Sequence, residues 1–228
     1  RNWAYERAAV IAVQTRECMR YFPQKLQKRM MVIPNPVDPS VQEPFRGERR
    51  RSVVFAGRLH RQKNPELLLR AFADFQKDYP DYVLEMFGKG ELEEALKQAA
   101  VELGIENKVI WHGFCPDVRK RIADAGMYVL SSNFEGISNS MLEAMAMGIP
   151  VIATDCPIGG CAEYIQNGRN GILVPVGDQK AMAGAMRKIA KDPAFAASVS
   201  ENGSKIREQF PIQAIADQML KAAEGAEK

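Results

Sequence analysis

The stretch that decides the fold runs from Met127 to Thr154 and has the sequence MYVLSSNFEGISNSMLEAMAMGIPVIAT. It contains two short apolar runs, 127–130 and 151–154, on either side of an apolar segment, 140–147, that is long enough for a helix. Short continuous apolar strands that alternate with helices are typical of a parallel sheet buried on both faces. This stretch therefore predicts one strand–helix–strand unit of an α/β domain.

The same alternation continues on either side of this unit. Further strands are expected at 52–55, 82–87, 109–111 and 171–174, and further helices at 64–79, 91–103, 117–124, 161–166, 179–191, 193–209 and 212–223. Asn64 and Pro65 mark the start of the first of these helices, because they supply an N-cap followed by proline at the first helical position. The prediction is a doubly wound parallel sheet with helices on both faces.

A separate unit precedes this domain. Residues 10–13 and 30–33 are short apolar strands, and Thr15 is placed to cap a helix over 16–22. The run from Pro34 to Pro39, PNPVDP, excludes regular structure and is interpreted as a linker. Because the sequence begins without methionine, we interpret it as a piece of a longer protein. The predicted units are a remnant of another domain at 1–34, a complete domain at 35–210 and a C-terminal helix at 211–228.

Composition narrows the class of protein. The 228 residues are 46% hydrophobic and 26% charged, which is ordinary for a globular protein and excludes collagen-like and wholly disordered chains. Lys and Arg total 31 against 28 Asp and Glu, a net charge of +3, so no nucleic-acid partner is expected. The longest apolar run, 144–153, is too short to span a bilayer.

Basic and sulfur-containing residues are the next local features. The densest basic cluster, Arg46, Arg49, Arg50 and Arg51, suits either a solvated loop or attraction to an anionic membrane surface. The cysteines, Cys18, Cys115, Cys156 and Cys161, are scattered and predict free thiols in a reducing cytoplasm, with a Cys156–Cys161 disulfide as the alternative. His60 and His112 are expected to be structural, and no zinc-ligand set is expected.

Ligands of doubly wound sheets bind beyond the carboxyl ends of the strands, so the loops there hold the candidate site residues. The loop after 52–55 places Arg58 and Lys63 where a helix begins. Since a helix N-terminus carries partial positive charge, added cations favour an anionic ligand, with solvated loop cations as the alternative. After 82–87, Gly88-Lys89-Gly90 is either a close approach of backbone to a ligand or an ordinary turn.

The loop and helix after 127–130 give the strongest signal. Glu143 is the one charged side chain of an apolar helix and needs a partner, for which a capping box with Ser140 as N-cap is one explanation. That explanation leaves out Glu135, which lies beside Gly136 in the preceding loop. Two carboxylates facing one crevice favour a hydroxyl-rich ligand, because ionised carboxylates only accept hydrogen bonds. The helix N-terminus can in addition donate to phosphate.

These residues resemble the motifs of family 4 retaining glycosyltransferases, whose GT-B fold has two Rossmann-like domains. Residues 135–143 resemble the Glu-x7-Glu motif of that family. The other similarities, in family order, are the interdomain hinge at 33–38, the Gly-Arg-Leu element at 55–59 with Lys63 and Asn64, Gly113, 148–154 and 170–174. The resemblance runs from about Ala8 to about Lys191. It implies the C-terminal, donor-binding half of such an enzyme, with a remnant of the N-terminal domain.

The resemblance also implies roles for matching residues. Arg58 and Lys63 would neutralise the donor diphosphate and stabilise the leaving group, and Glu135 would hold a hydroxyl of the donor sugar. Glu143 would bind the ribose. The remaining predicted donor contacts are Gly57, Gly88, Gly113, Phe114, Gly136, Ile137, Ser138, Asn139, Ser140 and Met141. The family often has an aromatic residue where this chain has Ile137, which bears on the shape of the sugar pocket.

The implied activity is transfer of a hexose, with retention, from a nucleotide-diphosphate sugar to a glycan or lipid-linked acceptor. UDP is the commonest carrier in the family, and the implied setting is cell-envelope or polysaccharide synthesis. No cofactor or metal is expected. The acceptor would bind the missing N-terminal domain, so the fragment alone is expected to be inactive, and its expected location is cytoplasmic, with peripheral contact at the inner face of the membrane left open. The alternatives are a non-catalytic nucleotide-sugar-binding module and another GT-B-like enzyme, such as a sugar-nucleotide epimerase or a phosphorylase.

Overall fold

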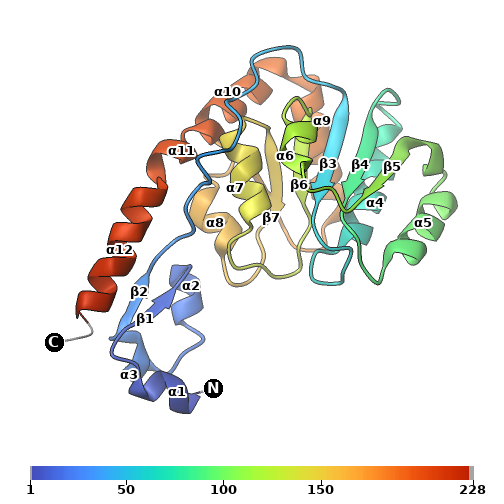
Figure 1. The fold of residues 1–228 in the computed structure, drawn as a ribbon. Helices are drawn as coiled ribbons and strands as arrows, with labels where there is room; N and C mark the ends of the chain where they lie inside the picture. The colour runs from blue at the N-terminus through green and yellow to red at the C-terminus, as the bar shows by residue number, and fades with distance from the viewer. Residues whose placement is uncertain (1, 226–228) are drawn as a thin grey trace.

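A parallel sheet in the order β5-β4-β3-β6-β7-β8 forms the larger unit of the structure, a computed structural model that describes residues 2–225 (Figure 1). The ends of the predicted units at residue 1 and at 226–228 lie outside the described residues. The strands are β3 (Ser52–Ala56), β4 (Val83–Phe87), β5 (Val109–Gly113), β6 (Met127–Leu130), β7 (Val151–Thr154) and β8 (Ile172–Val174). The predicted doubly wound, Rossmann-like sheet is confirmed. Its strand order reverses between β3 and β6, which is where such sheets bind ligands.

The helices follow the predicted pattern with small shifts at their ends. They are α4 (Pro65–Gln76), α5 (Glu93–Glu102), α6 (Val118–Ile122), α7 (Asn139–Ala146), α8 (Gly160–Tyr164), α9 (Gln179–Lys191), α10 (Pro193–Ser204), α11 (Ile206–Gln209) and α12 (Ile212–Gly225), with a 3-10 turn at Glu106–Lys108. The Asn64 side chain caps α4 by accepting from the Leu67 amide, as predicted. The helix predicted over 193–209 is instead two helices that break near Gly203, a residue with low helix propensity.

The core lies on both faces of the sheet because successive side chains of a strand point to opposite sides. On β3, Val53 and Phe55 pack under α4, α5 and α9, whereas Val54 and Ala56 pack under α6, α7 and α8. Burying each large apolar side chain stabilises the fold by about 1.5–3 kcal/mol. A slip of one residue would exchange the two faces, so this burial determines the register of the strands.

The N-terminal unit is small and includes two parallel strands, β1 (Ile11–Val13) and β2 (Met30–Val32). Its helices are α1 (Asn2–Arg7), α2 (Arg16–Met19) and α3 (Gln24–Gln27). Thr15 caps α2 as predicted, although this helix is shorter than expected. The C-terminal helix α12 lies along this unit (Figure 1) and shares an apolar cluster with Ile33 and Val10. The helix at the end of the chain thus packs against the unit at its beginning.

The segment from Pro34 to Pro39 is irregular, as predicted, and its one β-bridge joins Val37 to Pro211. Because the Val37 amide also donates to the carbonyl of Phe210 at 3.0 Å, the connection is tied to the start of α12. Among residues 2–225, no helix combines the length and the apolar composition needed to cross a membrane.

The arginine cluster belongs to the amino-terminal edge of the sheet. The Arg49 guanidinium donates to the carbonyls of Ala123 and Ala125, each at 3.1 Å, and to that of Gly148 at 2.6 Å. Arg49 therefore links the loop before β3 to the loops before β6 and β7. The prediction of a solvated loop is wrong for this residue, because the sequence could not show the carbonyls that surround it.

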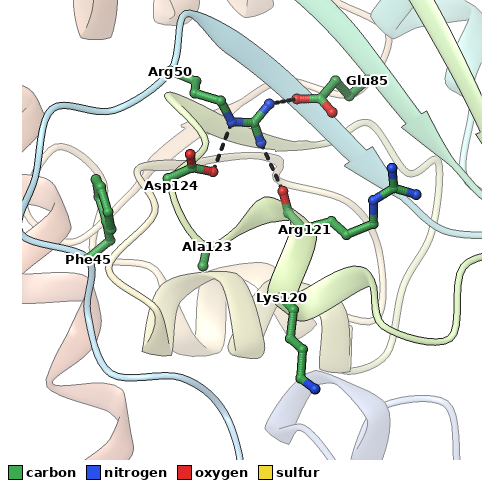
Figure 2. A pocket seen from close by; sticks show the side chains of 7 residues that line it. All are labelled: Phe45, Arg50, Glu85, Lys120, Arg121, Ala123 and Asp124. Atoms are coloured by element: carbon green, nitrogen blue, oxygen red, sulfur yellow. Dashed lines mark hydrogen bonds and ion pairs between the residues drawn. The ribbon is translucent and has the colours of Figure 1, made fainter.

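Arg50 is the centre of a second set of hydrogen bonds and lines a cleft of about 490 Å³ (Figure 2). It donates to Glu85 at 2.5 Å, to Asp124 at 2.9 Å and to the Arg121 carbonyl at 2.9 Å. Glu85 lies in the middle of β4, and its side chain is 6% exposed. Arg49 and Arg50, two of the guanidinium groups that suggested a membrane surface, are thus engaged by protein groups. Arg51 makes an exposed ion pair with Asp81 at 2.7 Å, and Arg46 is exposed.

Candidate functional site

The candidate site lies at the carboxyl edge of the sheet between β3 and β6, where the strand order reverses. Hydrogen bonds join the loops that follow these two strands. Ser131 Oγ donates to the Lys63 carbonyl at 2.8 Å, and Asn64 Nδ2 donates to Asn133 Oδ1 at 2.9 Å. Asn133 Nδ2 donates in turn to the Arg61 carbonyl at 2.8 Å. The two loops therefore form one connected wall of the site.

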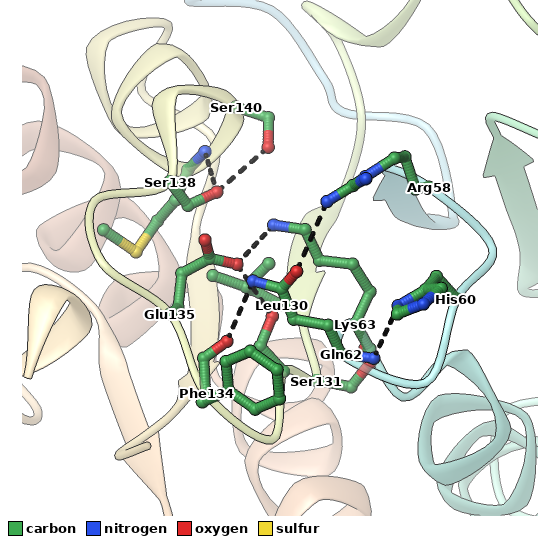
Figure 3. Close-up of polar contacts among 12 residues, drawn as sticks. Arg58, His60, Gln62, Lys63, Leu130, Ser131, Phe134, Glu135, Ser138 and Ser140 are labelled. Atoms are coloured by element: carbon green, nitrogen blue, oxygen red, sulfur yellow. Dashed lines mark hydrogen bonds and ion pairs between the residues drawn. The ribbon is translucent and has the colours of Figure 1, made fainter. Parts of the chain in front are cut away.

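Lys63 and Glu135 form an ion pair across this wall (Figure 3). Their side chains are 13% and 10% exposed, so the two charges interact largely away from water, which strengthens the attraction. Glu135 Oε2 contacts Lys63 Nζ and also accepts from Ser132 Oγ at 3.2 Å. Within residues 2–225, Glu135 Oε1 has no hydrogen-bond partner. The arrangement therefore offers a cation together with a free carboxylate oxygen that can accept from a hydroxyl.

Arg58 lies beside this pair and is exposed (Figure 3). Its Nη2 donates to Gln62 Oε1 at 3.3 Å, and Gln62 Nε2 donates to the Phe134 carbonyl at 3.3 Å. Among the described residues, no carboxylate pairs with Arg58. Its positive charge is therefore available to an anion, and Gln62, which sequence reasoning did not single out, links it to the loop after β6.

The glycines after β3 and β4 close the wall with backbone contacts. A Cβ on Gly88, whose φ is +134°, would lie 1.8 Å from the Gly57 carbonyl oxygen. The Gly57 amide donates to the Phe87 carbonyl at 2.9 Å, and the Gly88 amide donates to the Gly113 carbonyl at 2.8 Å. Of the two interpretations of Gly88, this geometry favours the turn, because its amide is already used. Phe114, after β5, is 74% exposed.

Helix α7 begins at Asn139, and its N-cap is Ser138, whose Oγ accepts from the Met141 amide at 3.4 Å. The capping box with Ser140 as N-cap is wrong. Ser140 Oγ instead accepts from the Tyr128 hydroxyl at 2.8 Å and lies 3.1 Å from Ser138 Oγ. The helix starts one residue earlier than predicted, because Ser138 has the extended backbone of an N-cap.

Two predicted donor contacts have buried side chains. Ile137 and Met141 belong to the apolar cluster beneath α7, so only their backbone can face a ligand. Asn139 is exposed. Gly136 is half-buried and lines a small cleft of about 240 Å³ together with Thr15 and other residues of the N-terminal unit. The structure therefore brings the loop after β6 against that unit.

Glu143 has a different partner from Glu135. Its side chain is 25% exposed, and burial raises its pKa while Arg119, with Nη1 at 3.9 Å from Oε1, opposes that shift. Arg119 also pairs with Asp38 at 2.6 Å. Hydrogen bonds from Ser40, and then from Arg119, lower the pKa of Asp38 to about 2. Sequence reasoning missed Arg119, although the isolated carboxylate of α7 had signalled that a partner was needed.

The histidines and cysteines lie against protein groups. His60 Nδ1 accepts from the Gln62 amide at 3.1 Å. His112 stacks on the Phe87 ring, with Nε2 3.0 Å from Glu85. Cys156 and Cys161 are buried free thiols. Within the part of the chain that the structure describes, no three His, Cys, Asp or Glu residues gather in a metal-ligand cluster.

The loop after β7 forms the third side of the site. A Cβ on Gly160, the first residue of α8, would lie 1.2 Å from the Gly136 carbonyl oxygen. The Glu135 amide donates to the Pro157 carbonyl at 3.2 Å. Close backbone packing against the loop after β7 therefore also holds the backbone of Glu135.

Comparison with known proteins adds a family and a fold. Residues 38–206 match the family model described as glycosyl transferases group 1. The lipopolysaccharide core biosynthesis glycosyltransferase LpsE of Rhizobium meliloti is 31% identical over 169 residues, which cover 74% of this chain and 48% of that protein. The chain spans about half the length of the curated relatives it matches.

Two solved structures show the same fold. HepE of Anabaena, in complex with UDP-glucose, superimposes with a TM-score of 0.88 at 23% identity, over 98% of this chain and 65% of that chain. The C-terminal domain of the glycosyl transferase group 1 family protein LpcC of Francisella tularensis superimposes with a TM-score of 0.70 at 23% identity. That match covers 78% of this chain and 100% of the other.

Proposed function

This chain belongs to the family of glycosyl transferases group 1, and from that premise we propose that it is the donor-binding half of an enzyme that transfers a hexose with retention. The donor is a nucleotide-diphosphate sugar. The observation that carries the proposal is the Lys63–Glu135 pair at the point where the strand order reverses, with the exposed Arg58 beside it.

Each of these groups has a role that its geometry supports. Arg58 and Lys63 neutralise the diphosphate and stabilise it as it leaves, because cations in a partly buried site act strongly on developing negative charge. Glu135 uses its free Oε1 to accept from a hydroxyl of the donor sugar. The leaving phosphate itself helps to take the acceptor proton in this mechanism, which requires no separate general base.

The remaining contacts lie along the wall between β5 and α7. Glu143 accepts from the ribose hydroxyls, and the backbone around Gly113 and Phe114 meets the base. The backbone amides at the start of α7 donate to the sugar or the phosphates, as helix N-termini do. The roles proposed for Gly57 and Gly88 are to bring the loops close together.

We propose UDP as the nucleotide, since HepE was solved with UDP-glucose, and a glycan or lipid-linked acceptor, since LpsE acts in lipopolysaccharide core biosynthesis. The acceptor binds a domain outside these 228 residues, so the enzyme works in envelope or polysaccharide synthesis only as a longer protein. The proposal places it in the cytoplasm, with peripheral membrane contact supplied by that longer protein, and assigns no metal or cofactor to the reaction.

Calorimetric titration of the chain with UDP, GDP and ADP tests this proposal. We expect UDP to bind and to raise the melting temperature, because a ligand that binds the native state stabilises it. No binding of any of the three by the folded chain would refute the proposal. A longer protein that binds UDP-sugars but neither hydrolyses nor transfers them, with Glu135→Ala as the control, would favour the non-catalytic module instead.

A further inference from the structure

The connection between the two units is linked to helix α7 at two points, once directly and once through Arg119. Asn35 Nδ2 donates to Asn139 Oδ1 at 2.7 Å. Three residues on, Asp38 pairs with Arg119, whose Nη1 lies 3.9 Å from Glu143 Oε1. Asn139 and Glu143 are four residues apart in α7 and therefore lie on the same side of the helix. One side of α7 is thus held by the connection, directly at its first turn and through Arg119 one turn later.

The same connection also contacts the N-terminal unit. Gln14 Nε2 donates to Asn35 Oδ1 at 2.7 Å, so three side-chain amides form a relay from the end of β1 to the start of α7. Gln14 Oε1 lies 3.2 Å from the position of a Cβ on Gly136, which is next to the carboxylate that pairs with Lys63. The relay therefore joins the loop after β6 and the start of α7 to the N-terminal unit.

The relay has a direction. Each amide accepts through its oxygen and donates through its nitrogen, so the Oδ1 of Asn139 is occupied by Asn35. Within residues 2–225, Asn139 Nδ2 has no hydrogen-bond partner and remains a donor. A donor at the N-terminus of a helix suits an anionic or carbonyl oxygen. Because Asn139 is exposed, anchoring its amide in advance lowers the entropic cost of ordering it on binding.

The second link, from Asp38 through Arg119, places a positive charge beside the Glu143 carboxylate. Glu143 must be ionised to act only as an acceptor for hydroxyl groups, and Arg119 is the cation beside it. Asp38 holds the Arg119 guanidinium at 2.6 Å, with the Ser40 amide and hydroxyl fixing the Asp38 carboxylate at 2.8 and 2.7 Å. A substitution of Asp38 would release Arg119 from this position and would leave the Glu143 side chain itself unaltered.

We propose that Asn35 and Asp38 are positioning residues of the donor site: Asn35 orients the Asn139 amide toward an oxygen of the nucleotide-diphosphate sugar, and Asp38 holds Arg119 against Glu143. This inference rests on the proposed function and goes beyond it. It assigns a part in binding the donor to the connection, which is interpreted from the sequence as a linker and, by resemblance, as an interdomain hinge.

Double-mutant cycles with UDP affinity as the readout test the inference. Asn35→Ala is expected to weaken UDP binding about 3- to 10-fold, which corresponds to one hydrogen bond. Asn139→Ala is expected to weaken it at least as much. In the Asn139→Ala background, Asn35→Ala should have no further effect, because it acts through Asn139. As a single variant, Asp38→Asn should likewise weaken UDP binding. In the Glu143→Gln background it should have no effect.

The controls separate this inference from the proposed function and from a loss of folding. Asn107→Ala, at an exposed asparagine far along the chain, should leave UDP affinity unchanged. Melting temperatures of all variants are measured without ligand, and a merely structural role would give additive losses of affinity in both cycles. UDP binding by the wild type together with an unaffected Asn35→Ala variant, or with additive effects, overturns the inference alone. Absence of any nucleotide binding by the wild type overturns the proposed function and the inference with it.

Discussion

The two edges of the sheet both gather cations, but they are built in different ways. At the amino edge, Arg49 and Arg50 make the closure themselves, through bonds to backbone carbonyls, to Glu85 and to Asp124. At the carboxyl edge, the loops are joined largely by neutral groups: the side chains of Ser131, Asn64 and Asn133, and close backbone contacts such as that between Gly57 and Gly88.

The difference separates structural charges from functional ones. Where side chains close an edge, their hydrogen-bonding capacity is used inside the protein, as it is for Arg50. Where neutral side chains and the backbone close most of an edge, charged groups such as Arg58 and one oxygen of Glu135 are left available to a ligand. Basic residues are closer together in the sequence at the amino edge than at the carboxyl edge. The clustering of basic residues alone would therefore place the ligand site at the wrong edge.

The largest effect is expected from Gly88→Ala. The added methyl group would meet the Gly57 carbonyl at 1.8 Å, at a φ that L-residues rarely adopt, so the wall must shift. Strain and overpacking together predict a loss of about 3 kcal/mol or more of the free energy of unfolding, measured in urea. Gly184→Ala, in the interior of α9 with nothing within 4 Å, is the control and should stabilise by about 0.5–1 kcal/mol. A stable Gly88→Ala variant that loses UDP affinity would restore the ligand interpretation.

Arg50→Ala should destabilise the protein without weakening UDP binding. It leaves the buried carboxylate of Glu85 without its cation, which predicts a loss of about 2–3 kcal/mol, below the range for a fully buried pair because Arg50 is 40% exposed. Urea unfolding and UDP titration are measured on the same sample. Arg51→Ala is the matched control, since its exposed pair with Asp81 contributes at most about 1 kcal/mol. A large drop in UDP affinity for Arg50→Ala would break the distinction between the edges.

Arg58→Ala should show the reverse behaviour. Losing a charge-assisted bond to phosphate should weaken UDP binding by about 1.5–3 kcal/mol. Unfolding stability should change by no more than about 0.5 kcal/mol, because the side chain is exposed. Calorimetry gives the affinity, with Arg70→Ala on the outside of α4 as the control. Unchanged affinity would remove Arg58 from the site.

The smallest effect concerns the pH dependence of UDP binding. The ionised form of Glu143 accepts from hydroxyl groups, so UDP affinity should fall as the pH falls through its pKa, which burial raises. Arg119 opposes this rise whereas Asp38 adds to it, so Arg119→Gln should move the loss of affinity to higher pH. Titrations between about pH 4 and 8 would detect the shift, which should amount to less than about tenfold in affinity at any one pH. Glu143→Gln should abolish this pH step, and a step that persists would assign it to another group.

Much of the fold could be predicted from local pattern. The strand at 127–130 and the cap at Asn64 depend on residues within a few positions, and both are confirmed. The N-cap of α7 was placed at Ser140 instead of Ser138, because two serines at similar positions satisfy the same local rule. The tertiary structure distinguishes them: Ser138 has the extended backbone of an N-cap, and Ser140 accepts from the Tyr128 hydroxyl of β6.

The sequence by itself determined the alternation of strands and helices, the carboxyl-edge loops as the place of the site, and the motifs that match the family. These are properties of chain order and short-range patterning. The tertiary structure alone decided which polar groups pair: Arg50 with Glu85 in β4, Glu143 with Arg119 and Asp38, and Asn35 with Asn139. Partners in these sets are separated by up to 104 residues along the chain, as Asn35 and Asn139 are. No local pattern encodes such distances, because they follow from how the sheet, the helices and the connection pack together.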